Sequence, residues 1–333
     1  MKAALQLPPE QENSFAWFGD DMVTREDEWI SMLTPDDIAE LEIAGERAAM
    51  SGKKLEEITA EDFPLPTLSS KLVEISGEIT KGRGFALLRG LPVGRYSEQE
   101  SSTIFYGLGT HLGSARTQNA QGHLLGHVRD LGMKSDDPNV RIYQTRERQT
   151  FHTDSADVVG LLCLQEAKSG GRSLLCSSTT IFNEMLSTRP DLLAVLFGPI
   201  ATDRRGEIPP GMLPYFLIPV FTFYEGALTA IYQRQYIDSA QRFPDAPRLT
   251  EHHIEALNMF DALANSPRIH FSMKLERGDM QFVYNHTILH DRTAFEDFSD
   301  DALKRHLLRL WLAVPGDRPL PEIFATKFGK RYS

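Results

Sequence analysis

From about Val140 onward the chain consists of short β-rich runs separated by turns, and this pattern limits the folds that it can adopt. Many short strands with helices outside them are typical of a β-sandwich or jelly roll, so we expect a mainly β fold with helical elaborations. Helical inserts are predicted at residues 179–197 and 250–264. Strands are predicted at residues 172–177, 215–223, 228–232, 269–275, 280–284 and 305–314.

The first part of the chain has a different, more helical character. It contains no repeat, low-complexity stretch or linker that would separate it from the rest. We therefore expect a single domain, residues 1–333, in which residues 1–110 form a helical elaboration packed on a barrel core at 111–315. Within that N-terminal part we predict helices that begin at the capping residues Thr34 and Ser97, a helix at 68–81 and a buried strand at 84–90.

The composition is that of a globular protein, with 41% hydrophobic and 24% charged residues. The formal net charge of −11 argues against a nucleic-acid or acidic-membrane partner, and the basic segment 327–331 is short and terminal. No apolar run reaches about 18 residues, and the first residues lack a signal-peptide pattern. Cys163 and Cys176 lie in apolar contexts that favour reduced core thiols. We therefore expect a cytoplasmic protein that acts on a small molecule, as a monomer or a homo-oligomer.

His152-Thr153-Asp154 is the segment most indicative of function. Two histidines and one carboxylate form the facial triad that binds Fe(II) and leaves positions open for substrate and O₂. The tripeptide alone is weak evidence, because with ten His and 46 acidic residues in 333, chance gives about one or two His-x-Asp/Glu pairs. A second such pair, His253-Ile254-Glu255, does occur.

The surroundings distinguish the two pairs. The second pair lies in the predicted helix 250–264, where residues two apart point in different directions. The first pair lies between β-rich runs at 139–145 and 158–164, and residues two apart on a strand share one face. His152 and Asp154 can therefore bind one metal ion together.

The rest of the site is expected downstream. His286 and His290 follow the predicted strand 280–284, and both are candidate third ligands. Arg305 and Arg309 then project from one face of an otherwise apolar run, whether that run is a strand or a helix. A buried guanidinium needs an anion, and its planar fork suits a carboxylate; a solvated basic edge is the alternative.

Four separated motifs occur in order: residues 151–154, 170–173, 285–297 and the arginine pair at 305 and 309. Together they resemble the taurine dioxygenase and clavaminate synthase-like group of Fe(II)/2-oxoglutarate-dependent oxygenases, over roughly residues 112–314. The resemblance implies a double-stranded β-helix, a cupin-like jelly-roll barrel with iron at one mouth. It also implies a dioxygenase that oxidises, and most simply hydroxylates, a small molecule with Fe(II), 2-oxoglutarate and O₂, releasing succinate and CO₂.

The resemblance also implies roles for individual residues of this chain. The implied iron ligands, which are also the catalytic centre, are His152, Asp154 and His290. Arg305 would pair with the distal carboxylate of 2-oxoglutarate, and Ser173, where relatives often have threonine, would contact the same carboxylate. Arg309 resembles a second active-site arginine that meets the cosubstrate or an anionic substrate.

Contacts with the substrate are predicted from position and polarity. The excess of arginines favours an amino acid or another carboxylate as the substrate. The candidate residues are Gln118, Tyr143, Arg204 and Arg234.

Two other classes of protein stay open on the sequence alone. One is a jelly-roll hydrolase or isomerase that uses Zn or Mn without 2-oxoglutarate. The other is a non-catalytic barrel that binds a ligand, in which His152 and Asp154 only form hydrogen bonds.

Overall fold

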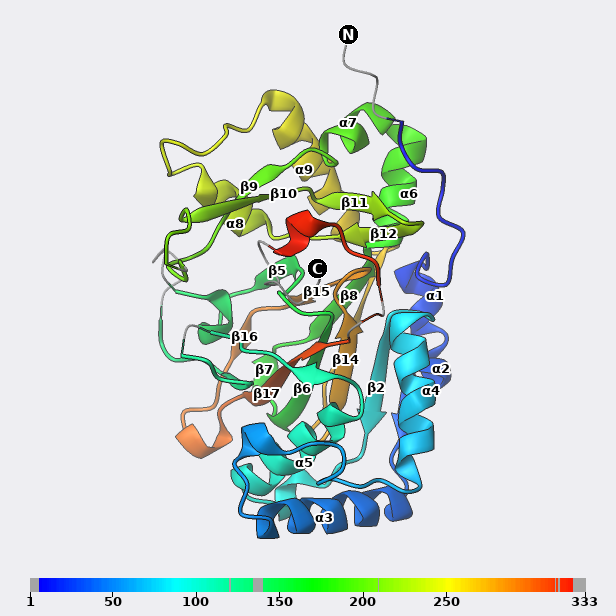
Figure 1. Cartoon of the computed structure of the whole chain (residues 1–333), viewed down its shortest axis with the longest axis vertical. Helices are drawn as coiled ribbons and strands as arrows, with labels where there is room; N and C mark the ends of the chain where they lie inside the picture. Colours follow the sequence, from blue (N-terminus) through cyan, green and yellow to red (C-terminus); the bar gives the residue numbers. More distant parts are fainter. Residues whose placement is uncertain are drawn as a thin grey trace.

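Two β-sheets form the centre of the computed structural model, which describes residues 6–119, 121–133, 140–208, 210–314, 316 and 318–325 (Figure 1). The larger sheet has the order β1-β2-β14-β6-β17-β3, with β4 also paired to β17. Its strands are β1 (Ile30–Met32), β2 (Phe85–Arg89), β3 (Ser114–Ala115), β4 (Leu125–Val128), β6 (Val158–Gln165), β14 (Met280–Tyr284) and β17 (His306–Ala313).

The smaller sheet has the order β13-β8-β15-β5. Its strands are β5 (Gln149–His152), β8 (Ser173–Ser177), β13 (His270–Met273) and β15 (Ile288–Arg292). The remaining strands form two-stranded ribbons: β7 (Ser169–Gly170) with β16 (Phe295–Glu296), β9 (Ile200–Asp203) with β10 (Tyr215–Ile218), and β11 (Phe221–Tyr224) with β12 (Ala227–Ala230).

The alternation of side chains explains why both faces of the larger sheet are covered. In β14, Met280, Phe282 and Tyr284 pack on the side of the N-terminal helices. Val283 points the other way, into a cluster with Leu175 of β8. The two sheets therefore face each other across a shared apolar core, and the predicted jelly roll is confirmed.

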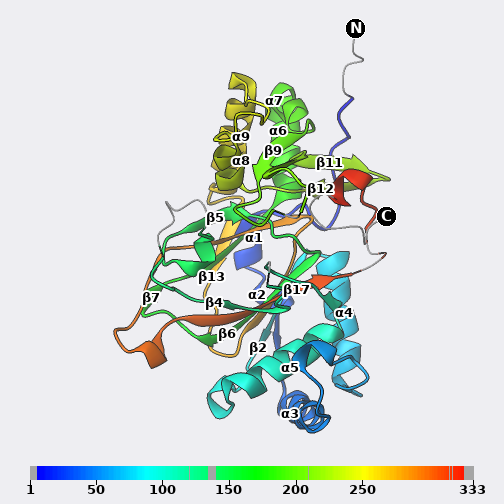
Figure 2. The same ribbon diagram turned by 60° about the vertical axis from the view of Figure 1, so that its left-hand side comes forward.

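The helices lie outside the two sheets (Figures 1 and 2). Buried residues of α3, α4 and α5 pack on the larger sheet, and those of α6, α7 and α9 cover the smaller one. The helices are α1 (Gly19–Val23), α2 (Glu26–Trp29), α3 (Pro35–Met50), α4 (Leu68–Thr80), α5 (Glu98–Thr110), α6 (Ser178–Thr188), α7 (Pro190–Val195), α8 (Arg234–Ala240) and α9 (Glu251–Ala264). Short 3₁₀ turns are η1 (Leu55–Glu57), η2 (Val93–Arg95), η3 (Ile142–Gln144), η4 (Asp301–Leu303) and η5 (Glu322–Phe324).

The capping residues were read correctly from the sequence. The side chains of Thr34, Ser97 and Thr250 each accept a hydrogen bond from the backbone three residues on, as the first residues of α3, α5 and α9 require.

Three sequence-based expectations were wrong in detail, and one helix was missed. Of the β-rich run 139–145, the described part forms η3, not a strand. The run 215–223 is divided between β10 and β11, and the helix 179–197 between α6 and α7, at the prolines 219 and 190. Helix α8 was not foreseen. The basic segment 327–331 lies outside the described residues.

The first 110 residues also contribute two strands to the larger sheet, in addition to the helices packed on it. Strand β2 pairs with β14 inside the larger sheet, and β1 pairs in parallel with β2 at its edge.

Among the described residues, none of the helices combines the length and apolar character that a membrane span requires. Cys163 and Cys176 are both buried and free, and burial raises the pKa of the Cys163 thiol to about 12.

Packing on the larger sheet gives a first testable expectation at Gly107 in α5. A Cβ there would lie 2.2 Å from a ring atom of Phe63, which is fully buried. We expect Gly107→Ala to lower the free energy of unfolding by about 1–3 kcal/mol, measured by chemical denaturation. Gly77 in α4 is the matched control because a Cβ there meets nothing within 4 Å. Gly77→Ala should instead stabilise by about 0.5–1 kcal/mol, and equal effects at both positions would contradict the packing argument.

Candidate active site

His152, Asp154 and His290 come together at one end of the barrel. His152 ends β5 and pairs with His290 in β15. Asp154 lies between them, with its carboxylate oxygens 3.9 Å from Nε2 of His152 and 3.8 Å from Nε2 of His290. The three residues present donor atoms that all lie within 4.8 Å of one another.

The expected position of Asp154 on a strand was wrong, although the expected proximity holds. Strand β5 ends at His152, so Asp154 belongs to the following turn. The side-chain oxygen of Asn285 accepts a hydrogen bond from the Asp154 backbone at 3.1 Å and fixes this turn. The same-face rule for strands therefore does not explain why the pair converges.

The hydrogen bonds of His152 select one form of its ring. Nδ1 donates to the backbone carbonyl of Thr150 at 2.8 Å, and the amide of Gln149 lies 2.8 Å from Nε2, which accepts from it. This tautomer presents the Nε2 lone pair, as a metal ligand must. Burial lowers the pKa of both imidazoles, to about 3 for His290, where His152 adds to the effect. Both rings are therefore in their neutral, metal-binding form.

Asp154 is held as a carboxylate by groups on β17. The indole N–H of Trp311 donates to its Oδ2 at 2.8 Å, and Nη1 of Arg309 donates to the same oxygen at 3.3 Å. Burial alone would raise the pKa of Asp154, but the charge of Arg309 and the hydrogen bond from the Trp311 indole hold it well below its usual range. Two neutral imidazoles and one carboxylate match the donor set of a divalent iron site.

A small cavity of about 40 Å³ joins these residues to Arg305 and Ser173. Arg305 is 5% exposed, and its Nη1 has no hydrogen-bond partner among the described residues. Burial lowers the pKa of Arg305 to about 10, still well above neutrality, so its charge persists. Ser173 shares the inward face of β8 with Leu175 and exchanges hydrogen bonds with Gln281 at 3.1 Å. A buried, unsatisfied guanidinium beside a hydroxyl fits a carboxylate ligand.

The glycine pair before Ser173 makes room for Arg305. Gly171 has φ +66°, and a Cβ there would lie 3.1 Å from Nε of Arg305. A larger residue at this position would be strained and would press on the guanidinium.

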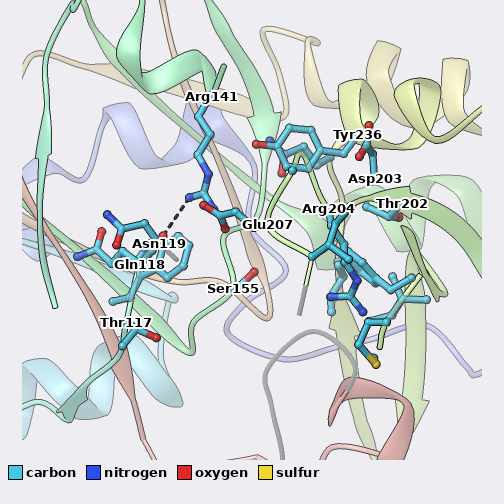
Figure 3. A pocket seen from close by; sticks show the side chains of 18 of the residues that line it. Thr117, Gln118, Asn119, Arg141, Ser155, Thr202, Asp203, Arg204, Glu207 and Tyr236 are labelled. Atoms are coloured by element: carbon cyan, nitrogen blue, oxygen red, sulfur yellow. Dashed lines mark hydrogen bonds and ion pairs between the residues drawn. The ribbon is translucent and has the colours of Figure 1, made fainter. Parts of the chain in front are cut away.

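A second, larger cavity of about 860 Å³ lies next to Asp154, and Ser155 and Trp311 are among its walls. Figure 3 shows Gln118, Asn119 and Arg141 on one side and Arg204 on the other. Arg141 forms an ion pair with Glu207 and donates to the backbone carbonyl of Gln118 at 3.0 Å. The other polar and aromatic residues that line this large cavity are Arg116, Thr117, Thr202, Asp203, Phe216, Gln233 and Tyr236.

The predicted substrate contacts fall in different places. Gln118 and Arg204 line the large cavity. Gln118 also accepts from Nε of Arg309 at 2.8 Å and donates to the Arg309 carbonyl at 2.7 Å. Tyr143 lines the small cavity and stacks under Arg309 at 4.8 Å. Arg234 lines neither cavity, because it is paired with Asp238 and Asp261.

His253 and His286, the two other histidines considered as metal ligands, have structural roles. His253 bonds to Thr250 at the start of α9, at 2.7 Å from its hydroxyl. His286 is buried and bonds to Asp157 at 2.8 Å. Sequence reasoning missed Gln149, Trp311 and the Arg141–Glu207 pair; Trp311 could have been found, because it shares the predicted face of Arg305 and Arg309.

The Trp311 hydrogen bond gives a second testable expectation. Trp311→Phe removes the only indole N–H that reaches Asp154 among the described residues, so Fe(II) affinity should fall roughly 10-fold in anaerobic titration. Trp29→Phe is the matched control: it also loses a buried indole hydrogen bond, to Met22 at 2.9 Å, far from this site. An unchanged Fe(II) affinity in Trp311→Phe, or an equal loss in both variants, would contradict the role assigned to Trp311.

Comparisons with known proteins agree on one family. The profile described as "Taurine catabolism dioxygenase TauD, TfdA family" matches residues 51–311. The chain is 33% identical to FR-33289 synthase of Streptomyces rubellomurinus over 90% of this chain and 89% of that protein. It is also 33% identical to the taurine hydroxylase-like protein SAT17 of Stachybotrys chartarum, over 94% of this chain and 84% of that one.

The fold has solved counterparts as well. An asparagine oxygenase, determined in complex with Fe(II), 3-hydroxyasparagine and succinate, superposes with a TM-score of 0.67 at 18% identity. That match covers 87% of this chain and 98% of the other. At this identity the likeness establishes the shared architecture.

Proposed function

The chain belongs to the TauD/TfdA family of dioxygenases, and from this premise we propose that it hydroxylates a small anionic molecule at the site of His152, Asp154 and His290. The prediction of an Fe(II)- and 2-oxoglutarate-dependent dioxygenase is confirmed at the level of the family. The family match also disfavours the two alternatives, a Zn or Mn hydrolase or isomerase and a non-catalytic barrel.

One observation carries the residue assignment. The small cavity contains both a neutral His-carboxylate-His donor set and the buried, unsatisfied guanidinium of Arg305. A metal site for hydrolysis has no need of the second feature, whereas a dicarboxylate cosubstrate needs an anion-binding group at its far end. We assign Arg305 and Ser173 to that end of 2-oxoglutarate.

Each side chain then has a defined task. Bound Fe(II), with 2-oxoglutarate and O₂, supplies the oxidising chemistry that releases succinate and CO₂ and hydroxylates a C–H bond. Trp311 and Arg309 hold the Asp154 carboxylate ionised and oriented. Thr150 fixes the ring of His152 through Nδ1, and the amide of Gln149 holds Nε2 until the metal takes its place. The apolar core around the barrel excludes water from the reacting atoms.

We place the substrate in the large cavity beside Asp154. Three arginines line it (Arg116, Arg141 and Arg204), so a carboxylate or another anionic group of the substrate has cationic partners there. Arg141 already pairs with Glu207, so an anion would compete with that carboxylate for the guanidinium. An amino acid suits the site because Glu207 also lines the cavity, and its carboxylate offers a partner for an ammonium group.

Succinate release tests this proposal across matched anionic, neutral and cationic small molecules, amino acids included. We expect turnover with anionic members, and Arg204→Gln should raise the KM for that substrate about 10-fold while the KM for 2-oxoglutarate stays unchanged. Arg234→Gln is the control, because Arg234 is paired outside both cavities. Substrate-dependent succinate only from neutral or cationic compounds would overturn the assignment of an anionic substrate.

The proposal extends to the setting of the enzyme. A single oxygenase domain in a reducing cytoplasm suits the two free, buried cysteines. It requires no nucleic-acid or membrane partner, and it is compatible with a homo-oligomer.

A further inference from the structure

A second His-His-carboxylate cluster lies outside the active site, where β4, β17 and the first turn of α5 meet. Its members are Glu98, His127 and His306, and one donor atom of each lies within 4.8 Å of the other two. The carboxylate of Glu98 is 3.9 Å from Nδ1 of His127 and 3.8 Å from Nδ1 of His306. Among the described residues this is one of two groups of three that could hold a metal ion, the other being the active site.

Strand pairing explains why these side chains converge. His127 of β4 is opposite Leu308 of β17. His306 lies two residues before Leu308, beside a register shift against β6, and its ring meets that of His127. The face of β17 that carries Leu308 packs against the N-terminal helices, and the capping box of Ser97 places Glu98 at the first position of α5. The cluster is therefore held by regular structure, not by a loop.

The two imidazoles are arranged as a chelating pair. Nδ1 of His127 and Nε2 of His306 share a hydrogen bond at 2.9 Å, which a bound ion would replace, and the ring planes are 31° apart. Two nitrogens at this separation, each about 2.1 Å from one ion, subtend close to a right angle, the angle between neighbouring ligands in octahedral or tetragonal coordination. Glu98 adds a hard carboxylate oxygen, 3.9 Å from the Nδ1 of His127 that belongs to this pair.

We propose that Glu98, His127 and His306 bind a divalent transition-metal ion of the imidazole-binding class, such as Ni(II), Cu(II) or Zn(II), independently of the active-site iron. His306 is 13% exposed at its side chain, whereas Glu98 is 57% exposed, so an ion reaches the site from solvent and keeps water on that side. A hollow of about 490 Å³, lined by Glu98, Ser101 and His306, leaves room for those waters.

The protonation of the pair favours this assignment. Burial lowers the pKa of His127 and, together with His127, that of His306 to about 4. Both rings are thus neutral at physiological pH, and a neutral imidazole has the lone pair that a metal requires. Arg129 contributes to both shifts and is the nearby cation that a bound ion must tolerate.

Metal stoichiometry of the full chain tests the proposal. Metal-stripped protein is dialysed against Ni(II) alone, and bound metal is measured by elemental analysis. We expect two equivalents for the wild type and one for Glu98→Gln, His127→Asn and His306→Asn. His123→Asn is the matched control, because His123 lies near β4 but bonds to Asn119, and it should retain two equivalents.

The active-site variant separates this proposal from the proposed function. Asp154→Ala combined with His290→Ala should keep one equivalent, and the further change His127→Asn should remove it. On the Asp154→Ala/His290→Ala background, the Cu(II) electron paramagnetic resonance spectrum should show coupling to two imidazole nitrogens. One equivalent in the wild type that the cluster variants retain, a second equivalent that survives all three cluster variants, or coupling to fewer than two nitrogens would overturn the second site.

Discussion

Asp154→Ala should abolish the formation of succinate and weaken Fe(II) binding by more than about 100-fold. The change removes the carboxylate of the donor set, and even a group that only orients a metal ligand costs up to about 100-fold in affinity when it is lost. It also leaves Arg309 without its buried anion, so folding of the variant must be verified by circular dichroism. The measurement is an anaerobic titration with Fe(II) and 2-oxoglutarate, followed by the weak visible charge-transfer band of the chelate.

The second His-x-acid pair supplies the control for this experiment. His253→Ala removes a histidine that bonds to Thr250 at the start of α9 and is remote from the cluster of ligands. It should keep the full band and full turnover. A band of undiminished intensity in folded Asp154→Ala would show that Asp154 is not a ligand.

Arg305→Met should raise the KM for 2-oxoglutarate by at least about 30-fold, while the KM for the primary substrate changes little. Loss of one partner of a buried charge pair costs about 2–5 kcal/mol of binding, and about 2 kcal/mol corresponds to roughly 30-fold. The ligand-free protein should not lose stability, because the guanidinium is buried with an unsatisfied Nη1 and methionine fills similar space. The readouts are the two KM values and the thermal midpoint without ligands.

Arg172→Met is the matched control for Arg305→Met. Arg172 immediately precedes Ser173, but it is exposed and its guanidinium bonds to the hydroxyl of Ser272 at 2.7 Å. Its replacement should leave the KM for 2-oxoglutarate within about twofold. Equal effects of the two variants, or no effect of Arg305→Met, would remove Arg305 from the cosubstrate site.

Periodicity in the sequence was sufficient where one strand carries several functional residues. The two-residue period of β17 places Arg309 and Trp311 on one face, and the structure directs both at Asp154. Arg305, just before the strand, lines the same cavity as Arg309. Periodicity was also sufficient to exclude His253 as a metal ligand. The helix predicted to carry it is α9, which begins at its predicted cap, Thr250. The ordered motifs also identified the family and the barrel, because each motif is a short local pattern that can be recognised in the sequence.

Contacts between distant segments could not be predicted in this way. Gln118 and Arg309 are 191 residues apart and form reciprocal hydrogen bonds, which no local pattern encodes. The Arg141–Glu207 pair joins two segments whose lengths and paths depend on the rest of the fold. Asp154 shows the converse, since the expected proximity was right but its cause is the turn held by Asn285, not strand periodicity.

The two cavities differ in what builds their walls. The small one is lined by residues of paired strands. Ser173, His290 and Arg309 are tied to the sheets by registers on both sides, and His152 by its pairing with β15. Much of the wall of the large one comes from connecting segments around residues 116–119, 204–208 and 210–212. Insertions and substitutions in such segments are tolerated far better than changes in paired strands. Natural variation and directed evolution can therefore diversify which molecule is oxidised while the oxidising machinery stays constant.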